Sequence, residues 1–458
     1  MNQTVPAKDA ADPQVHRRRF VFLTSVTIAL GGFLFGYDTA VISGAILFVR
    51  RQFNLGSIET EAAVSIVLAG ALLGAAAGGY LGDRFGRRPT MLVIALIYGV
   101  FGATTGLANG VTVFVLSRFF VGAAVGVSSM LTPLYIAELA PADIRGALVT
   151  LNQLAISTGV VVAYYVDYLF AGSGSWRWMF ISAVVPAILL LVGLAYLPET
   201  PRWMASQGRF EDAQNILTRI EGPQEVQRDI EELRHIAEAD RLKLRDLFNR
   251  RFSKPLIVGI VLAIFQQITG VNTIVYYAPT IFQMVGFTNA SNAILVTFLI
   301  GFVGLVAVIV SMFLVDKIGR RPLLLVSLAG MCVILFHLAH VLAEPSPKKW
   351  MVVADIIFYL AAFDIGLGPI FWLLISEIYP TTVRGQAMSV ATVAIWASDF
   401  LVTATFLTLV EHLGMTGSFR LFAVLSLAAF IFSYWMVPET RGRTLEEIEN
   451  SWGQVKSI

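Results

Sequence analysis

Apolar residues run along most of this chain in stretches long enough to cross a bilayer, and short polar segments separate them. A transmembrane helix needs about 20 consecutive, mostly apolar residues. By this measure we expect an all-α membrane protein with twelve transmembrane helices. The predicted spans are residues 20–49, 62–82, 90–109, 112–138, 146–170, 176–197, 255–285, 291–315, 322–342, 350–379, 386–410 and 419–437.

One long polar segment, residues 199–254, interrupts this pattern between the sixth and seventh predicted spans. It is rich in Glu, Arg and Asp, and its apolar residues recur at helical spacing over 216–220 and 230–236. We interpret it as short amphipathic helices on the membrane surface, whose simplest role is that of a linker without chemistry. The predicted domains are a cytoplasmic tail (1–19), an N-terminal six-helix bundle (20–198), the linker (199–254), a C-terminal six-helix bundle (255–437) and a second cytoplasmic tail (438–458).

The composition agrees with a membrane protein of many spans. Of the 458 residues, 56% are hydrophobic and 14% are charged, whereas a soluble domain carries about 25% charged residues. The net charge of +2 gives no reason to expect a nucleic-acid partner. The single cysteine, Cys332, allows no internal disulfide. The first span, which follows the polar stretch ending at Arg19, is too long for the core of a signal peptide.

The distribution of Lys and Arg indicates how the chain is oriented. If the N-terminus lies in the cytoplasm, 26 of the 33 Lys and Arg residues fall on cytoplasmic segments. Six fall on outer loops, and the remaining one, Arg118, lies inside a span. Because Lys and Arg are enriched on the cytoplasmic side of membrane proteins, we expect a multi-pass protein of the cell (inner) membrane with both termini in the cytoplasm.

The chain also repeats itself. Three motifs that follow spans two, four and six return in the same order after spans eight, ten and twelve, at offsets of 233, 239 and 240 residues. A repeat of this kind indicates two related six-helix bundles with a site between them. The motif pairs are 82–89 and 315–322, 138–146 and 377–385, and 198–200 and 438–440.

A group of amides and phenols lies inside the seventh predicted span, between Phe265 and Tyr277. Lipid offers these side chains no hydrogen-bond partner, so they must face protein or a polar cavity. On an uninterrupted helix Gln267 and Tyr276 would point in opposite directions, but a break at 269–270 would let both line one cavity. Such a lining suits a hydroxyl-rich solute such as a sugar; the alternative is hydrogen bonding between neighbouring spans. The polar residues are Gln266, Gln267, Asn272, Tyr276 and Tyr277.

Charged residues inside spans are functional candidates, because a charge at bilayer depth is unfavourable. Asp38 lies near the middle of the first span and Arg118 lies inside the fourth. We predict that these two side chains pair, either as a proton site or as a structural ion pair. Asp364 and Asp399 are further candidates: each could be structural, and Asp399 could be a second proton site or a protonated hydrogen-bond donor. Trp396 shares the helical face of Asp399.

The sequence offers no sign of enzyme chemistry. His337 and His340 in the ninth span are interpreted as core or interface residues, because no metal-ligand cluster surrounds them. No nucleophile–base group or nucleotide-binding loop is recognisable either. We therefore expect no enzyme activity and no cofactor.

In its spans, its repeats and its intramembrane polar residues, the chain resembles the sugar porter family of the major facilitator superfamily, over about residues 20–450. The likeness is greatest to bacterial proton-coupled xylose and glucose symporters. The motifs that carry it are Gly-Tyr-Asp at 36–38, the loop at 83–88 and its copy at 316–321, the segments 198–203 and 438–443, and Gln266-Gln267 followed by Asn272.

The resemblance implies two halves that rock about a sugar site at mid-membrane. It also implies that Asp38 is the proton site and that Arg118 controls it, since passive facilitators of the family carry Asn at that position. Two polar family positions are missing, because Gly304 replaces an Asn in span eight and Ile395 replaces an amide in span eleven. The implied sugar contacts are Gln153, Gln266, Gln267, Asn272 and Trp372, with Phe35 and Tyr276 or Tyr277 as neighbours.

We also predict a cytoplasmic latch, meaning a network of ion pairs between loops that forms in the outward-facing state and biases the equilibrium between states. Positive charge that only fixes the topology is the simpler explanation of these residues, and both can hold. The predicted latch residues are Asp83, Arg84, Arg87, Arg88, Glu138, Arg145, Glu199, Asp316, Arg320, Arg321, Glu377, Arg384 and Glu439.

The function we expect is import of a monosaccharide, a hexose or pentose, by proton symport through alternating access. The protein is expected to work as a monomer in the lipid bilayer. Two alternatives stay open: a sugar uniporter in which Asp38 is structural, and a sugar sensor that binds without moving its ligand.

Overall fold

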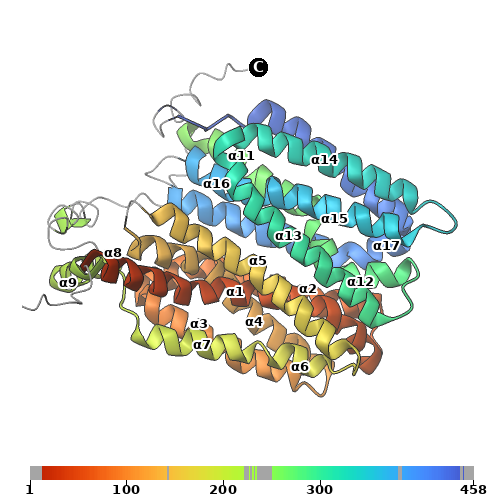
Figure 1. Ribbon diagram of the computed structural model, residues 1–458, viewed down its shortest axis with the longest axis horizontal. Helices are drawn as coiled ribbons and strands as arrows, with labels where there is room; N and C mark the ends of the chain where they lie inside the picture. Colours follow the sequence, from red (N-terminus) through yellow and green to blue (C-terminus); the bar gives the residue numbers. More distant parts are fainter. Residues whose placement is uncertain are drawn as a thin grey trace, which may run out of the picture.

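The computed structural model is a bundle of long helices (Figure 1) and describes residues 13–141, 144–220, 226, 230, 231, 233, 234, 250–379, 384–443 and 447. No strand occurs among these residues. Parts of three predicted segments lie outside the described residues: 1–12 of the first tail, most of 221–249 in the linker, and most of 444–458 in the second tail.

The N-terminal half forms one bundle, drawn red to yellow-green in Figure 1. Its sixth span consists of two helices, because the helix is interrupted at Ser182 and Ala183. The helices are α1 (Pro13–Phe53), α2 (Ser57–Phe85), α3 (Arg87–Gly106), α4 (Val111–Leu139), α5 (Arg145–Ala171), α6 (Trp176–Ile181) and α7 (Val184–Tyr196).

The C-terminal half forms a second bundle, drawn green to blue. Two of its spans are also broken, at Thr269–Gly270 and at Gly366. The helices are α11 (Arg250–Ile268), α12 (Val271–Met284), α13 (Ala290–Ile318), α14 (Arg320–Val341), α15 (Lys349–Ile365), α16 (Leu367–Ile378) and α17 (Arg384–Met436).

The predicted number of spans is recovered once α17 is divided. Within the described residues, 11 helical segments are long and apolar enough to cross a membrane. The longest, α17, contains Gly414 with φ 69° and ψ 169°, which is not helical. Gly414 separates the predicted eleventh and twelfth spans, so the chain crosses twelve times in two bundles of six.

Two short helices of the linker, α8 (Pro201–Ser206) and α9 (Phe210–Ile220), lie beside the start of α1 (Figure 1). The backbone N–H of Trp203 donates to the Thr200 hydroxyl, which caps α8. The apolar face of α9, including Ile216 and Ile220, is buried. The predicted amphipathic character is therefore present in α8 and α9. We call this end of the molecule the α8 end.

The internal repeat is visible in atomic detail at the α8 end. Glu199 accepts hydrogen bonds from the backbone N–H groups of Arg87 and Arg88, both at 3.1 Å. Glu439 accepts the same two bonds from Arg320 and Arg321, both at 3.2 Å. Each glutamate thus holds the first N–H groups of a helix, α3 or α14, which otherwise have no partner within the helix.

A glycine precedes each of these helices in the same conformation. Gly86 has φ 100° and ψ 159°, and Gly319 has φ 104° and ψ 161°. A Cβ atom would lie 2.3 Å from Glu199 Oε2 at the first position and 2.8 Å from Glu439 Oε2 at the second. Both the positive φ and the close approach of the carboxylate require glycine here.

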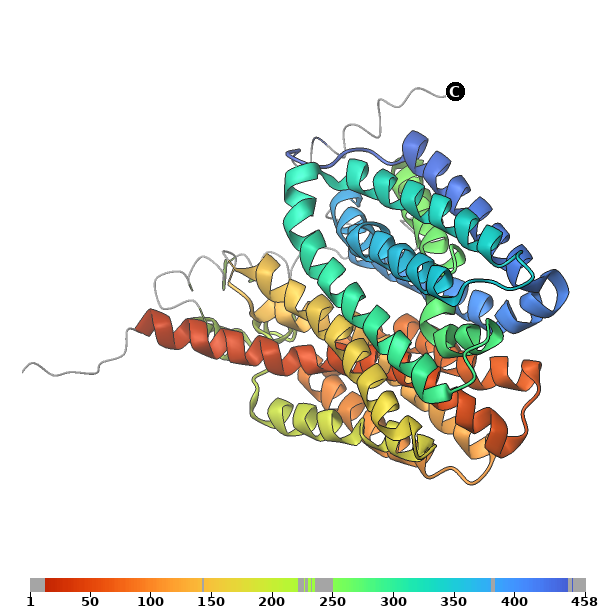
Figure 2. The same cartoon turned by 45° about the vertical axis from the view of Figure 1, so that its right-hand side comes forward.

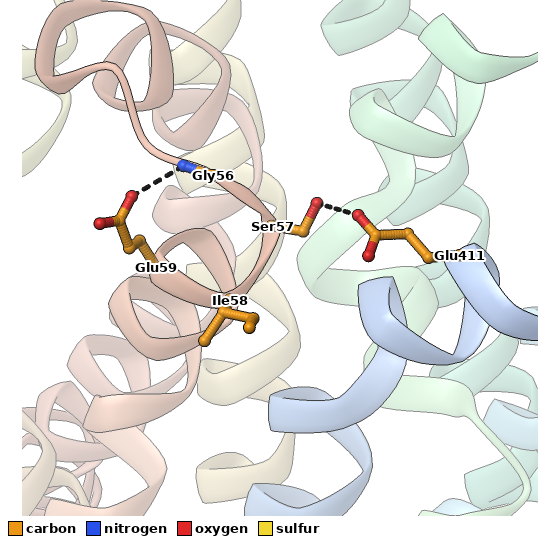
Figure 3. Close-up of a pocket in the computed structure, with 5 residues that line it drawn as sticks. All are labelled: Gly56, Ser57, Ile58, Glu59 and Glu411. Carbon is orange, nitrogen blue, oxygen red and sulfur yellow. Dashed lines mark hydrogen bonds between the residues drawn. The ribbon is translucent and has the colours of Figure 1, made fainter.

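The two bundles meet at the end opposite α8, which we call the Ser57 end (Figure 2). Glu61 of α2 accepts hydrogen bonds from the backbone N–H and the hydroxyl of Thr408 in α17, both at 2.7 Å. The Ser57 hydroxyl donates to Glu411 of α17, and both residues line a hollow of about 470 Å³ at the start of α2 (Figure 3). The Ser57 end is therefore bridged between the halves.

Candidate substrate and proton site

The helix break at Thr269–Gly270 builds the centre of the site. Gly270 adopts the left-handed conformation, with φ 92° and ψ 13°. As a result α11 ends with Gln266 and Gln267 near its last turn, and α12 begins with Asn272 turned back toward them. Asn272 Nδ2 donates to Gln267 Oε1 at 2.8 Å. The break predicted from the sequence is present, and it joins residues that a straight helix would separate.

The three amides form one hydrogen-bonded series, which we call the amide chain (Gln266, Gln267 and Asn272). Gln267 Nε2 donates to Gln266 Oε1 at 3.3 Å. Gln266 Nε2 donates in turn to the backbone carbonyl of Gly368 at 3.2 Å, next to the break between α15 and α16. Gln266 and Gln267 are buried, and Asn272 is partly buried.

Asp399 of α17 closes the other end of the amide chain. Its Oδ2 accepts from Asn272 Nδ2 at 2.8 Å and from the Tyr276 hydroxyl at 3.3 Å. Its Oδ1 accepts from the Thr403 hydroxyl at 3.2 Å. Three donors therefore converge on one buried carboxyl group, an arrangement that satisfies an acceptor-only side chain.

Asp38 and Arg118 form a second buried polar group, in the N-terminal half. Arg118 Nη1 lies 2.5 Å from Asp38 Oδ1. The exposed fractions are 0% for Arg118 and 7% for Asp38. Within the described part of the chain, Asp38 Oδ2 and Arg118 Nε and Nη2 are buried without a hydrogen-bond partner. The guanidinium also lies over the Phe180 ring, 5.5 Å from its centroid.

The rings of Phe35 and Trp396 connect the two halves at the level of these groups. Phe35 belongs to α1, three residues before Asp38, and Trp396 belongs to α17, three residues before Asp399. Their ring centroids are 5.5 Å apart. The acid of each half therefore lies one helical turn from an aromatic ring that contacts the opposite half.

Comparison with known proteins identifies the family that this arrangement belongs to. The family model described as "Sugar (and other) transporter" matches residues 24–452. The chain belongs to this sugar transporter family.

Several relatives of known name cover nearly the whole chain. The galactose-proton symporter of Escherichia coli K12 is 35% identical over 97% of this chain and 97% of its own length. The D-xylose-proton symporter of the same strain is 35% identical over 94% of this chain and 96% of its own length. The putative metabolite transport protein YwtG of Bacillus subtilis is 40% identical over 92% of this chain and 93% of its own length.

Solved structures give the same fold. The inward open conformation of the xylose transporter XylE from E. coli is similar with a TM-score of 0.82 and 33% identity, covering 94% of this chain and all of that one. A XylE structure bound to 6-bromo-6-deoxy-D-glucose, described as a major facilitator superfamily proton:xylose symporter, has a TM-score of 0.81 and 34% identity. The fold of two pseudo-symmetric six-helix bundles is therefore that of the major facilitator superfamily.

The other predicted sugar contacts of this transporter are placed as follows. Gln153 lies partly buried on α5 and makes no side-chain hydrogen bond to another described residue. Trp372 lies partly buried on α16, with its ring centroid 5.2 Å from that of Phe371. Tyr277 is separate from the amide chain, because its hydroxyl donates to the carbonyl of Thr403 and its ring packs on Phe406. Of the two predicted tyrosines, only Tyr276 joins the polar group.

An acid occupies the space left by one of the two missing family amides. At Gly304 in α13 a Cβ atom would lie 2.7 Å from Asp364 Oδ2, so the carboxyl group of α15 lies directly against the glycine. At the second position Ile395 is buried and contributes no hydrogen-bonding group. Asp399, one turn further along α17, supplies a polar group nearby.

The predicted latch residues bind mainly within their own half in this structure. Arg87 pairs with Glu138 at 2.9 Å and with Asp83 at 3.1 Å. The repeat of this arrangement joins Arg320 to Glu377 and to Asp316, both at 3.1 Å.

In this state five other latch arginines donate to oxygen atoms that are not carboxylates. Arg84 donates to the Tyr80 hydroxyl, and the other four donate to backbone carbonyls near helix ends, where carbonyls have no partner within the helix. The remaining pairs are Arg88 with Leu194 and Ala195, Arg145 with Ala140, Arg321 with Tyr434, and Arg384 with Tyr379.

Three buried acids were missed by the sequence analysis: Asp167, Glu61 and Asp355, the last of which pairs with His337. Asp167 of α5 is fully buried, and its Oδ2 accepts from the backbone N–H of Gly44 in α1 at 3.1 Å. Glu61 lies just before the predicted second span and bridges the halves. The signal for Asp167 was an acid inside the fifth predicted span. No comparable signal marked Glu61, whose partner lies 347 residues away.

Proposed function

We propose that this transporter imports a monosaccharide together with a proton, by alternating access between its two halves. The observation that carries the proposal is the buried contact of Asp38 with Arg118 one helical turn from Phe35, whose ring meets Trp396 of the other half. A titratable pair in one bundle thus lies next to the face on which the bundles move. The relatives named as galactose-proton and D-xylose-proton symporters support the same function.

The amide chain and its surroundings form the sugar site in this proposal. Amides donate and accept hydrogen bonds, as sugar hydroxyls do, and the rings of Trp372, Trp396 and Phe35 offer apolar surface for the face of a pyranose. The substrate class is a neutral pentose or hexose.

The mechanism couples the two sites through the state of Asp38. Arg118 stabilises the carboxylate electrostatically while they are in contact, and a proton replaces that stabilisation when they separate. One proton moving down a membrane potential of 100 mV supplies about 2.3 kcal/mol, enough for roughly fifty-fold accumulation of sugar.

In this proposal the α8 end faces the cytoplasm of a cell with an energised inner membrane, and both termini lie there. The excess of Lys and Arg on the loops of that end supports this orientation. The structure, with its bridged Ser57 end, then corresponds to an inward-facing state. The latch would form at the α8 end when the Ser57 end opens, in a protein that acts as a monomer.

Uptake into proteoliposomes tests the proposal. With an inward proton gradient we expect accumulation of a pentose or hexose above its outside concentration. Asp38→Asn should abolish accumulation but retain exchange of labelled for unlabelled sugar. Asp355→Asn is the matched control, because Asp355 is also an acid within a span but pairs with His337 at 2.9 Å on the adjacent helix. Equal accumulation with and without a proton gradient would show a different energy source, and exchange without accumulation in the unmodified protein would favour a uniporter.

A further inference from the structure

The hydrogen-bond direction at Asn272 is set by its neighbours. Asn272 Nδ2 donates to Gln267 Oε1 and to Asp399 Oδ2, both at 2.8 Å. A carboxamide NH₂ group has two hydrogens. Both hydrogens are therefore used within the protein, and Oδ1 is the atom of this amide that remains for a ligand.

The same direction holds along the rest of the amide chain. Gln266 Nε2 donates to the carbonyl of Gly368, and Gln267 Nε2 donates to Gln266 Oε1. A backbone carbonyl and an ionised carboxylate both only accept. The amide chain thus ends in an acceptor at each side, and each Gln keeps one N–H hydrogen free while Asn272 keeps none.

Residue 399 decides which group Asn272 presents. A carboxylate at this position can only accept, so it requires the NH₂ of Asn272 to face it. An asparagine at the same position could donate to Asn272 Oδ1, and Asn272 could then turn one N–H toward a ligand while still donating to Gln267. An aspartate at 399 can therefore only accept from Asn272, whereas an asparagine can also donate to it and so allow Asn272 to turn.

We propose that Asp399 is a positioning residue that fixes Asn272 with its carbonyl oxygen toward the transported sugar. The inference rests on the proposed function and adds a selection rule to it. The sugar must donate a hydroxyl hydrogen to Asn272, whereas it accepts hydrogen bonds from Gln266 and Gln267. A hydroxyl at the Asn272 position cannot be replaced by a group that only accepts.

Deoxy and deoxyfluoro sugars separate these two roles, because fluorine can accept a hydrogen bond weakly but cannot donate one. For the unmodified protein we expect one ring position at which both analogues compete at least about tenfold less well than the parent sugar, since neither analogue can donate to the partly buried Asn272 oxygen. At positions facing Gln266 or Gln267, the fluoro analogue should compete better than the deoxy analogue.

The test is competition of these analogues with labelled parent sugar in proteoliposomes, using the monosaccharide that shows saturable uptake. In Asp399→Asn the fluoro analogue should regain affinity, relative to the deoxy analogue, at the position where both were rejected. Thr403→Val is the matched control: it removes one donor to Asp399 but leaves the acceptor that orients Asn272, so the original pattern should persist.

The outcomes separate the inference from the proposed function. If the unmodified protein tolerates fluorine at every position where it rejects the deoxy sugar, the inference is wrong, and no variant is needed to show it. An unchanged pattern in an active Asp399→Asn variant overturns it as well. Absence of saturable uptake of any monosaccharide by the unmodified protein would overturn the proposed function, and the inference with it.

Discussion

Arg118 holds Asp38 through one nitrogen only, with 2.5 Å between Nη1 and Oδ1. An arginine can bind both oxygens of a carboxylate through two parallel hydrogen bonds, but here the second oxygen and two further guanidinium nitrogens take no partner among the described residues. A single contact between two buried charges can be broken by a small shift of one helix, which suits a group that must bind and release a proton.

The pair makes a prediction about stability. Arg118→Gln leaves the Asp38 carboxylate buried without its partner, and breaking a buried ion pair from one side destabilises by about 3–5 kcal/mol. We therefore expect a lower melting temperature in detergent. Adding Asp38→Asn to this variant removes the remaining buried charge and should restore part of the lost stability. A double variant as unstable as the sum of the two single variants would show that the contact contributes nothing.

The bridge at the Ser57 end predicts a shift in conformational equilibrium. Glu61 is 3% exposed and binds Thr408 of the other half through both carboxylate oxygens. Glu61→Ala removes two hydrogen bonds to a charged group, each worth about 1.5–3 kcal/mol, and only in the state in which the Ser57 end is closed. We expect the population with an open Ser57 end to rise by at least about tenfold.

Thiol labelling can measure this shift. A cysteine placed at Gln153, in a Cys332→Ser background, should react faster with a membrane-impermeant reagent from the Ser57 side when Glu61 is replaced. Glu59→Ala is the matched control, since Glu59 accepts from the N–H of Gly56 in its own half and from no other described residue (Figure 3). Equal labelling of the two alanine variants would mean that the Glu61 bridge does not hold the end closed.

Sequence reasoning succeeded where a physical requirement, such as a partner for a buried charge, could be met by few residues of the chain. Arg118 inside a span needs an acid, and Asp38 near the middle of the first span was the partner predicted for it. Likewise, Gln267 and Tyr276 on opposite faces of one helix could share a cavity only if the helix broke, and Gly270 was the residue able to break it. The duplicated motifs fixed the two bundles, because each motif binds the start of a helix in the same way in both halves.

Sequence reasoning failed where the answer depends on the rotation of a helix about its axis or on which end of the transporter is closed. The choice between Tyr276 and Tyr277 is set by how far α12 turns after the break, which no pattern in the chain specifies. The Glu61 bridge joins residues from different halves, so its existence depends on which end is closed. In this state Arg145 and Arg384 donate to carbonyls at nearby helix ends, so their pairing with acids in the outward-facing state stays a prediction.

The break itself gives a third prediction. Alanine at Gly270 would need the left-handed conformation at φ 92°, which is unfavourable by roughly 1–2 kcal/mol for a residue with a Cβ. That Cβ would also lie 2.7 Å from the Phe422 ring. Gly270→Ala should lower the melting temperature and weaken sugar binding.

Gly146 provides the matched control for this variant. It lies in the first turn of α5, and apart from its chain neighbours and its own helix backbone no atom of the described residues lies within 4 Å of a Cβ built there. Gly146→Ala should leave both the melting temperature and sugar binding nearly unchanged. Normal binding by Gly270→Ala would mean that the amide chain does not depend on the left-handed break.

The closeness of Gly304 and Asp364 gives the last prediction, which concerns the missing family amide. A Cβ at 304 would lie 2.7 Å from Asp364 Oδ2, so an asparagine side chain and the present carboxyl group cannot both keep their places. Gly304→Asn alone should therefore raise the KM for sugar uptake by at least about tenfold, through a displaced and unpaired acid. Asp364→Ala alone should also raise it, if the acid supplies the hydrogen bond that the asparagine would otherwise make.

The double variant, Gly304→Asn with Asp364→Ala, shows whether an asparagine at 304 can replace the acid at 364 or whether the two positions act independently. With Asp364→Ala in place, the asparagine at 304 has room and can supply the lost polar group, so the double variant should bind sugar better than either single variant. Such a result would mean that the acid of α15 supplies the hydrogen-bonding group that an asparagine in α13 can also supply. Effects on the KM that multiply in the double variant would instead mean that the two positions act separately, despite their contact.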